Sequence, residues 1–186
     1  MHGSARGDGA FGPTVQSFDR RVDAAIEKWR HDPTAARLMT AASHLGDMSL
    51  VWHLAAAARG VQSDRKARQA VALAALIGLE SLIVNQGVKR LFRRERPTDS
   101  GDERFEVRTP STSSFPSGHA SAAVFAATVL VTLDGKKSLP LWGTLAGVVA
   151  GSRAFVRIHH ASDVVGGAVV GLGLGLVARP FVKRLR

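Results

Sequence analysis

The 186-residue sequence contains no cysteine and has fewer acidic than basic side chains. The absence of cysteine excludes disulfide bonds, a thiol nucleophile and zinc sites built on thiolates. The opening residues MHGSARGDGAFGPT lack the apolar segment of a secretory signal peptide, so none is expected. The sequence shows no internal repeats, no strand-like alternation and no His, Asp and Glu spacing typical of metal ligands. We therefore expect an all-α protein without a metal or other cofactor.

The charge balance comprises 25 Lys and Arg against 15 Asp and Glu, a net charge of +10. In a soluble protein this excess would indicate nucleic-acid binding. Here the charges alternate with long uncharged stretches, which is typical of a membrane protein with basic flanks and loops. We expect the bilayer, and no nucleic acid, as the partner. A non-catalytic basic protein that binds membranes or nucleic acid remains an alternative.

Five apolar segments approach the length that crosses a bilayer, about 20 residues of helix. They cover residues 38–58, 69–88, 117–133, 139–156 and 163–182. The prediction is a multi-pass transmembrane helical bundle in the cell membrane.

The region before the first span has an apolar side chain at every third or fourth position: Val15, Phe18, Val22, Ile26 and Trp29. This pattern predicts an amphipathic helix over residues 14–32. Trp and basic residues suit a membrane interface, and packing of the helix on its own protein is an equally good interpretation. Residues 1–13 are expected to be a flexible tail, and residues 33–186 a transmembrane domain.

Polar residues gather at the ends of the apolar segments. If the spans alternate in direction, the end of the second, the start of the third, the end of the fourth and the start of the fifth share one membrane face. The polar residues near these ends are Lys89, Arg96, Ser117, Gly118, His119, Arg153, His159 and Asp163. Their convergence predicts a single functional site on that face.

The chemistry of this set points to phosphate. Lys89, Arg96 and Arg153 are fixed cations that suit the charges of a phosphoryl group. Backbone N–H groups at Ser117 and Gly118, at a helix start, can add donors. The two histidines can supply a nucleophile and a general acid. The aspartate four residues after the second histidine can hydrogen-bond its ring and fix its tautomer.

Three motifs contain these residues in a fixed order. Lys-x6-Arg-Pro stands at 89–97, Pro-Ser-Gly-His at 116–119 and Ser-Arg-x5-His-x3-Asp at 152–163. The set resembles the three-part signature of the type 2 phosphatidic acid phosphatase superfamily, the membrane lipid phosphatases. The resemblance implies a lipid phosphate phosphatase. Family members usually have six transmembrane helices, and here the first is missing or reduced to the amphipathic helix.

The resemblance also implies a role for each matched residue. His159 would attack phosphorus and form a phosphohistidine, His119 would protonate the leaving oxygen, and Asp163 would orient His159. The phosphate would be bound, without a metal, by Lys89, Arg96, Ser117, Gly118 and Arg153. The motif spacing selects His159 over its neighbour His160, for which we expect a supporting or surface position.

The remaining ionisable residues have ordinary interpretations. Arg90, Arg93 and Arg94 are expected to face lipid headgroups. Asp47 and Glu80 are expected to be satisfied polar groups inside the bundle, and balancing the charge of the cationic site is the alternative for either.

The motifs bind only the phosphate and leave several lipids open as the substrate. These include polyprenyl diphosphate, phosphatidylglycerol phosphate, phosphatidic acid and prenyl-linked sugar phosphates of cell wall biosynthesis. The small size and Ala/Arg/Gly-rich composition resemble actinobacterial members of the family. That resemblance favours decaprenylphosphoryl-5-phosphoribose. A vanadate-dependent haloperoxidase shares the anion pocket and is the alternative enzyme class, although such proteins are larger and soluble.

Overall fold

The computed structural model describes residues 11–98 and 102–186. Within these ranges it contains helices and loops and no β-strand, which confirms the all-α prediction. The α-helices are α1 (Gly12–Arg30), α2 (Pro33–Gly46), α3 (Leu50–Gly60), α4 (Asp64–Leu82), α5 (Gly118–Asp134), α6 (Leu139–Phe155) and α7 (Ala161–Lys183). Short segments of other helix types also occur: η1 (Asp47–Ser49), η2 (Ile83–Gly87), η3 (Val88–Leu91) and η4 (Lys136–Ser138).

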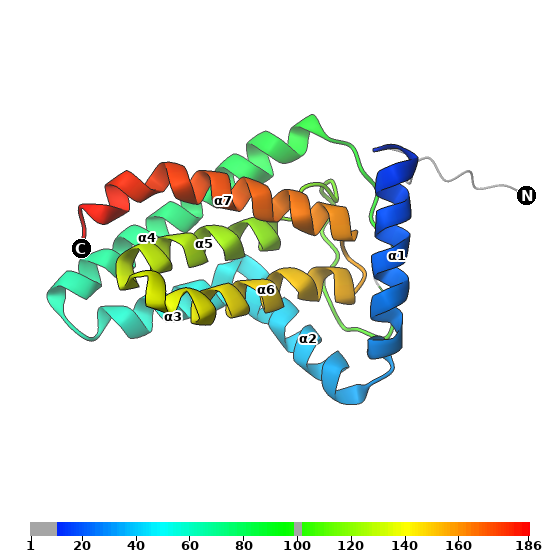
Figure 1. Ribbon diagram of the computed structural model, residues 1–186, viewed down its shortest axis with the longest axis horizontal. Helices are drawn as coiled ribbons and strands as arrows, with labels where there is room; N and C mark the ends of the chain where they lie inside the picture. The colour runs from blue at the N-terminus through cyan, green and yellow to red at the C-terminus, as the bar shows by residue number, and fades with distance from the viewer. Residues whose placement is uncertain (1–10, 99–101) are drawn as a thin grey trace, which may run out of the picture.

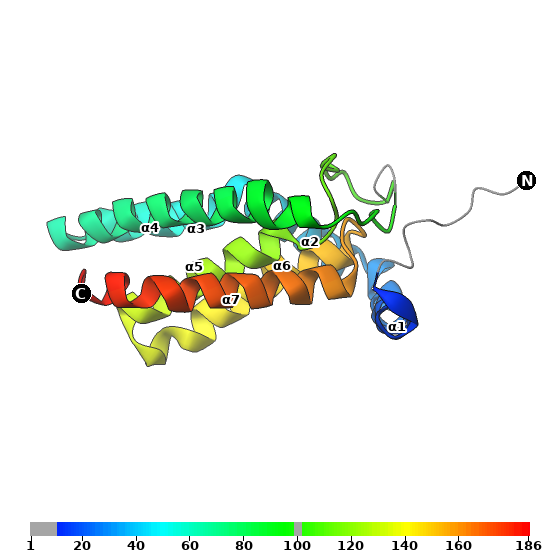
Figure 2. The ribbon, with the colours of Figure 1, turned by 90° about the horizontal axis from the view of Figure 1, so that it is seen from above.

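The helices from α4 to α7 follow the long axis of the molecule, and α1 crosses one end of them (Figures 1 and 2). Helix α5 is central, because it packs against α4, α6 and α7 and buries most of its side chains. Helix α3 packs against α4, and α2 packs against α6. The site described below lies at the end that α1 crosses.

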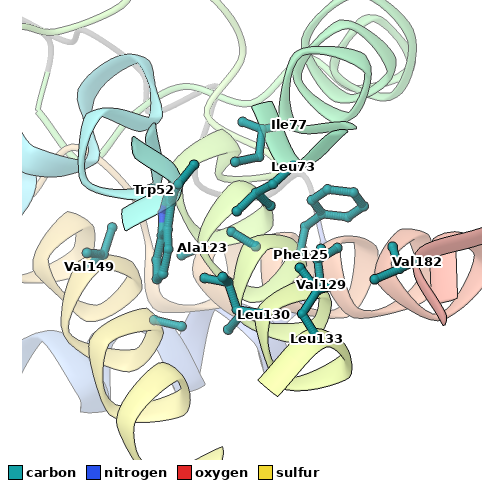
Figure 3. Close-up of a cluster of buried hydrophobic side chains, with 14 residues drawn as sticks. Trp52, Leu73, Ile77, Ala123, Phe125, Val129, Leu130, Leu133, Val149 and Val182 are labelled. Atoms are coloured by element: carbon teal, nitrogen blue, oxygen red, sulfur yellow. The ribbon is translucent and has the colours of Figure 1, made fainter. Parts of the chain in front are cut away.

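The main hydrophobic core contains side chains from all five helices from α3 to α7 (Figure 3). Trp52 of α3 and Leu73 of α4 are almost completely buried, as are Leu130 of α5, Val149 of α6 and Val182 of α7. Burying a side chain of this size contributes about 1.5–3 kcal/mol relative to leaving it in water. This core fixes the helices that position the site.

Helices α5 and α7 approach each other along a glycine seam, formed on α7 by Gly167, Gly171 and Gly175. A Cβ atom at Gly171 would overlap the backbone of Ser121, and one at Gly167 would overlap the carbonyl of Ser117. At Gly175 a Cβ would lie 2.8 Å from Thr128. Small residues spaced by four allow backbones to come this close.

The predicted first span, residues 38–58, is not one continuous helix. Helix α2 ends at Gly46, and η1 separates it from α3. Within η1, Met48 and Ser49 have φ values of 49° and 59°, in the left-handed region that a right-handed α-helix does not contain. The predicted span is therefore divided between two helices, and its crossing of the membrane stays a prediction.

Two helical segments are long and apolar enough to cross a membrane: Asp64–Leu91, which is α4 with its extension, and α7. Helix α5 is a shorter apolar helix. Only 22% of the apolar window in each of the two long segments is buried inside the protein. A core helix of a soluble protein would be mostly buried, so this exposed apolar surface indicates a membrane environment.

Helix α1 lies in the region of the predicted amphipathic helix and contacts α2, α6 and α7. Its fully buried side chains are the charged residues Asp19 and Arg30, whereas Phe18 and Trp29 of the apolar stripe are 43% and 58% exposed. The face that packs on the bundle therefore coincides only in part with the predicted stripe, since Ile26 of the stripe packs against the buried cluster of Phe105 and Phe155. Helix α1 already includes residues 12 and 13 of the predicted tail, and residues 1–10 lie outside the described residues.

Candidate active site

The ends of four helices meet where α1 crosses the bundle. The extension of α4 ends there and α5 begins there, and the same end holds the last turn of α6 and the first turn of α7 (Figure 1). The loops 92–117 and 156–160 join these ends. The three motifs are therefore brought together although they are far apart in the sequence.

His159 lies in the loop between α6 and α7 and is only 3% exposed. Its Nε2 atom is 3.3 Å from Nη1 of Arg96. Its Nδ1 atom is 3.4 Å from Oγ of Ser114 and 3.7 Å from Oδ2 of Asp163. The Ser114 hydroxyl donates to the same carboxylate oxygen at 2.5 Å. Asp163 thus acts on the ring at ion-pair range, with Ser114 bridging the two.

The protonation state of His159 follows from this environment. Burial lowers the pKa of His159 to about 3; the charges of Arg96 and Arg153 act in the same direction, and Asp163 opposes them. The ring is therefore neutral near pH 7. We assign its hydrogen to Nδ1, which faces Ser114 and Asp163, because that tautomer leaves the lone pair on Nε2. A neutral ring with its lone pair on Nε2, which faces the Arg96 guanidinium, can act as a nucleophile when the phosphate takes up that guanidinium.

Asp163 is completely buried near the start of α7. Besides the Ser114 hydroxyl, it accepts the backbone N–H of His160 at 2.8 Å and Nη1 of Arg94 at 2.5 Å. His160 is the N-cap residue of α7 and is half-buried. Its backbone therefore helps to hold the aspartate that faces His159.

Arg94 is 6% exposed, so the expectation that it faces headgroups was wrong. Its guanidinium donates to Asp163, to Asp19 of α1 at 2.6 Å and to Oγ of Ser162 at 2.7 Å. Asp19 also accepts the Ser162 backbone N–H at 2.8 Å. The buried position of Arg94 has a physical cause: it neutralises two buried carboxylates that belong to different helices.

Arg153, at the end of α6, is 1% exposed. Its Nη1 donates to Oγ of Ser43 and lies 3.8 Å from Asp47. Its Nε and Nη2 atoms have no hydrogen-bond partner in the described part of the chain. Buried guanidinium donors are expected to be paired, so this cation can receive an anion.

The other two predicted cations lie nearby. Lys89 is 7% exposed, and its Nζ atom is 3.4 Å from Oγ1 of Thr112. Arg96 uses its guanidinium on the carbonyls of Pro110, Thr112 and Ile158, each at 3.0 Å. These contacts tie the loop that carries Arg96 to the loop that carries His159.

Ser117 is the N-cap of α5, and its Oγ accepts the N–H of Ala120 at 3.4 Å. Its own backbone N–H donates to the carbonyl of Asp163 at 3.0 Å. The expectation that this N–H serves a phosphate was therefore wrong, because it already joins α5 to α7. The Ser117 hydroxyl hydrogen can still be donated. Gly118 packs on Asn85, where a Cβ would lie 3.1 Å from the amide oxygen.

His119, in the first turn of α5, has a carboxylate of its own. Its Nε2 atom lies 2.8 Å from Oδ1 of Asp47, which belongs to η1. Asp47 is 39% exposed and therefore not the interior polar group that the sequence suggested. The two predicted catalytic histidines each have a carboxylate neighbour, from opposite parts of the chain.

A cavity of about 680 Å³ opens beside Lys89 and Arg96. It is lined by the loop segments 92–96 and 109–113 together with Asn85 and Gln86. In residues 11–98 and 102–186, no group of three His, Asp or Glu side chains could hold a metal ion. The cavity is large enough for a polar headgroup whose phosphate faces the cations.

Sequence reasoning missed Arg94, Ser114 and Asp19 as residues of this site, and it offered Asp47 only as an alternative counter-charge. Arg94 stands in a run of basic residues with no local feature that separates it from its neighbour Arg93. Ser114 lies in a Ser/Thr-rich stretch, where the proximity to the Pro-Ser-Gly-His motif was the only pointer. Asp47 and Asp19 lie outside all three motifs.

Buried cations around a neutral histidine, with a second histidine beside them, define a class of site that can bind a phosphoryl group and attack it with a ring nitrogen. Residues 69–186 match the PAP2 superfamily, and the chain belongs to that family. It is accordingly a lipid phosphate phosphatase and a membrane protein.

Two curated relatives share the name decaprenylphosphoryl-5-phosphoribose phosphatase. The protein from Mycolicibacterium smegmatis is 37% identical over 136 residues, covering 72% of this chain and 70% of its own length. The protein from Mycobacterium tuberculosis is 34% identical over 136 residues, covering 73% of each chain.

A solved structure shares the fold. The transmembrane PAP2-type phosphatidylglycerolphosphate phosphatase from Bacillus subtilis superposes with a TM-score of 0.74, at 24% identity. The match covers 95% of this chain and 90% of that one, so it includes α1 to α3 as well as the helices that carry the motifs.

Proposed function

We propose that this chain is a multi-pass cell-membrane phosphatase that cleaves a lipid phosphate or diphosphate through a phosphohistidine on His159, without a metal. Two features of the site together carry the proposal: His159 is buried and neutral, and two guanidinium donors of Arg153 have no hydrogen-bond partner in the described part of the chain. The first supplies a nucleophile and the second a place for the phosphate charge.

The proposed reaction begins with binding of the phosphate by Lys89, Arg96 and Arg153, together with the Ser117 hydroxyl and the Gly118 N–H. Nε2 of His159 then attacks phosphorus, and Asp163 stabilises the positive charge that develops on the ring.

The remaining steps use the second histidine. His119 donates a proton to the lipid oxygen as its bond to phosphorus breaks. Water then attacks the phosphohistidine, His119 accepts a proton from that water, and phosphate is released.

The membrane placement follows from the helix arrangement. We propose about five crossings within a transmembrane domain of residues 33–186, with the first made by the broken pair α2 and α3. Helix α1 lies at the interface on the active-site side, where the exposed Trp29 and basic residues suit headgroups. The exposed apolar surface of α4 and α7 supports this arrangement.

A prenyl-linked sugar phosphate, decaprenylphosphoryl-5-phosphoribose, is the proposed substrate. The names of the two mycobacterial relatives support it, and the polar cavity beside Lys89 and Arg96 is suited to a sugar headgroup. Asn85, Gln86 and Thr112 offer that headgroup hydrogen-bonding groups.

The test is phosphate release by purified protein in detergent, with EDTA present and with His159→Ala as the blank. The substrates are decaprenylphosphoryl-5-phosphoribose, undecaprenyl diphosphate, phosphatidylglycerol phosphate and phosphatidic acid. We expect turnover in EDTA, inhibition by orthovanadate and the highest kcat/KM on the first lipid. Activity that disappears in EDTA and returns with magnesium would overturn the metal-free mechanism, and a preference for another lipid would overturn the substrate.

A further inference from the structure

The segment that presents Asp47 to His119 is held in a fixed shape. Met48 and Ser49, directly after Asp47, both have left-handed backbone conformations, which non-glycine residues rarely adopt. On the other side, a Cβ at Gly46 would lie 2.7 Å from the His119 ring. The ring thus packs on Gly46 while its Nε2 meets the Asp47 carboxylate.

The surroundings of His119 are otherwise cationic. Arg153 on α6 and Lys89 on η3 both place a positive charge near this ring. In the described part of the chain, Asp47 is the carboxylate that contacts this ring. A general acid must carry a proton when the leaving group departs, so the site needs a negative charge at this point.

We propose that Asp47 is a positioning residue that keeps His119 oriented and protonated for the departure of the lipid alcohol. This inference rests on the proposed function. When the phosphate binds, its charge compensates Lys89 and Arg153, and the Asp47 carboxylate then contacts the imidazolium directly. Asp47 lies outside the three motifs and outside the region that matches the family.

In the first half of the reaction, the phosphorus–oxygen bond to the lipid breaks and its electron pair goes to the lipid oxygen. That oxygen takes a proton from the His119 ring. The lipid alcohol leaves, and the neutral ring stays beside Asp47. When water attacks the phosphohistidine, the ring accepts a proton from the water, and the electron pair of the broken phosphorus–nitrogen bond returns to His159.

Asp47 also has other charged neighbours. Its Oδ1 atom lies 3.8 Å from Nη1 of Arg153, and its Oδ2 atom lies 3.7 Å from Nδ1 of His44. A competing role is therefore that of a counter-ion for Arg153, which would affect phosphate binding rather than acid catalysis. The two roles differ in how they depend on the leaving group and on pH.

The experiment compares wild type and Asp47→Asn on a lipid phosphate and on p-nitrophenyl phosphate between pH 5 and pH 9. A lipid alkoxide needs a proton to leave, whereas nitrophenolate needs little help. We expect Asp47→Asn to lose about tenfold or more in kcat on the lipid at pH 7.5 and about twofold or less on p-nitrophenyl phosphate. The alkaline limb of the lipid profile should move to lower pH, because the ring loses its proton more readily without the carboxylate.

The controls separate this role from a structural one. Asp64→Asn, an exposed carboxylate at the start of α4, should match wild type on both substrates. Asp47→Glu should recover part of the lipid activity. The His119 ring should also titrate at lower pH in Asp47→Asn than in wild type, as followed by ring ¹⁵N NMR with inorganic phosphate bound. If Asp47→Asn does not fold, Asp47→Glu serves for the same comparisons with smaller shifts.

The outcomes are distinct. Equal losses on both substrates at every pH, with an unchanged ring titration, would make Asp47 a counter-ion of Arg153 and overturn the inference. A wild-type protein that releases phosphate from neither substrate would overturn the proposed function instead.

Discussion

Residues 69–186 and residues 11–68 contribute to the site in opposite ways. The first region matches the PAP2 superfamily and supplies both histidines and the buried cations. The second lies outside that match and carries none of the motifs. It nevertheless contacts charged or titratable residues of the site: Asp19 contacts Arg94, Ser43 contacts Arg153, and Asp47 contacts His119.

The difference shows where a cationic site obtains its balance of charge. Buried charges without partners cost several kcal/mol, so the cations of an anion site need partners while the site is empty. The motifs fix the groups that touch the phosphate. Any segment that reaches the same place can present a carboxylate or a hydroxyl, so these partners need no motif.

The largest expected effect is a loss of activity and concerns residues 69–186, the region that carries the motifs. His159→Ala should lower kcat on the proposed lipid substrate by at least about a thousandfold, because no other group replaces the nucleophile. His160→Ala should keep most of the activity, because the motif spacing selects His159 as the nucleophile and the His160 backbone N–H that donates to Asp163 stays in place. Phosphate release by the two folded variants checks this. Equal loss in both would show that the motif spacing selects the wrong histidine.

The next effect tests the link between the two regions through Arg94. Arg94→Met leaves the buried carboxylates of Asp19 and Asp163 without their shared cation and should lower the free energy of unfolding by about 3–5 kcal/mol. The matched control is Arg93→Met, at the exposed neighbouring position. Thermal unfolding in detergent measures both. If the two variants melt at the same temperature, α1 is not held to the site by this ion-pair network.

A smaller effect is expected at Ser43, the hydroxyl that pairs with Arg153. Ser43→Ala should raise KM for the lipid by about tenfold or more with little change in kcat, since a hydrogen bond to a charged group contributes about 1.5–3 kcal/mol and about 1.4 kcal/mol is a factor of ten. Ser138→Ala, at the far end of the bundle, is the control. A fall in kcat with unchanged KM would contradict a role in holding the phosphate-binding guanidinium.

For the last comparison, we expect no change in the protonation state of the His159 ring. Its pKa of about 3 keeps the ring neutral at pH 5, and its contacts to Ser114, Asp163 and Arg96 all come from the motif region. Ring ¹⁵N NMR should therefore show a neutral His159 at pH 5 in wild type and in Ser43→Ala alike. An imidazolium signal in either would show that the ring is not shielded as described.

The same pKa has a consequence for stability. The unfolded chain has the ordinary histidine pKa near 6.5 and so binds a proton that the folded protein does not. The contribution of His159 should therefore make the protein less stable as pH falls below about 6.5, and this loss should continue toward pH 3.

The sequence predicts the later helices well because residues next to each helix mark where it begins and ends. The predicted spans 117–133, 139–156 and 163–182 correspond closely to α5, α6 and α7, since charged or Pro-containing segments interrupt the apolar runs. The break between α2 and α3 has no such marker. It depends on left-handed conformations at Met48 and Ser49, which Gly46 and the His119 ring hold in place through contacts with another part of the chain.

The site shows the same division. The motif spacing identified residues that the structure brings to one end of the bundle, and their catalytic roles stay a prediction. Arg93 and Arg94 are chemically identical neighbours, yet one is exposed and the other is buried between Asp19 and Asp163. That distinction arises when α1 packs against α7, so it is a property of tertiary structure and is absent from any short window of sequence.

The glycine seam of α5 and α7 has a mechanical consequence. His119 stands at the start of one helix and His159 just before the other, and the two backbones touch directly at Gly167 and Gly171. The distance between the two histidines is thus set by direct contact between the backbones of α5 and α7. A bulkier residue in the seam would increase that distance, so adaptation to larger or smaller headgroups is expected in the loop segments 92–96 and 109–113, which line the cavity and lie outside the seam.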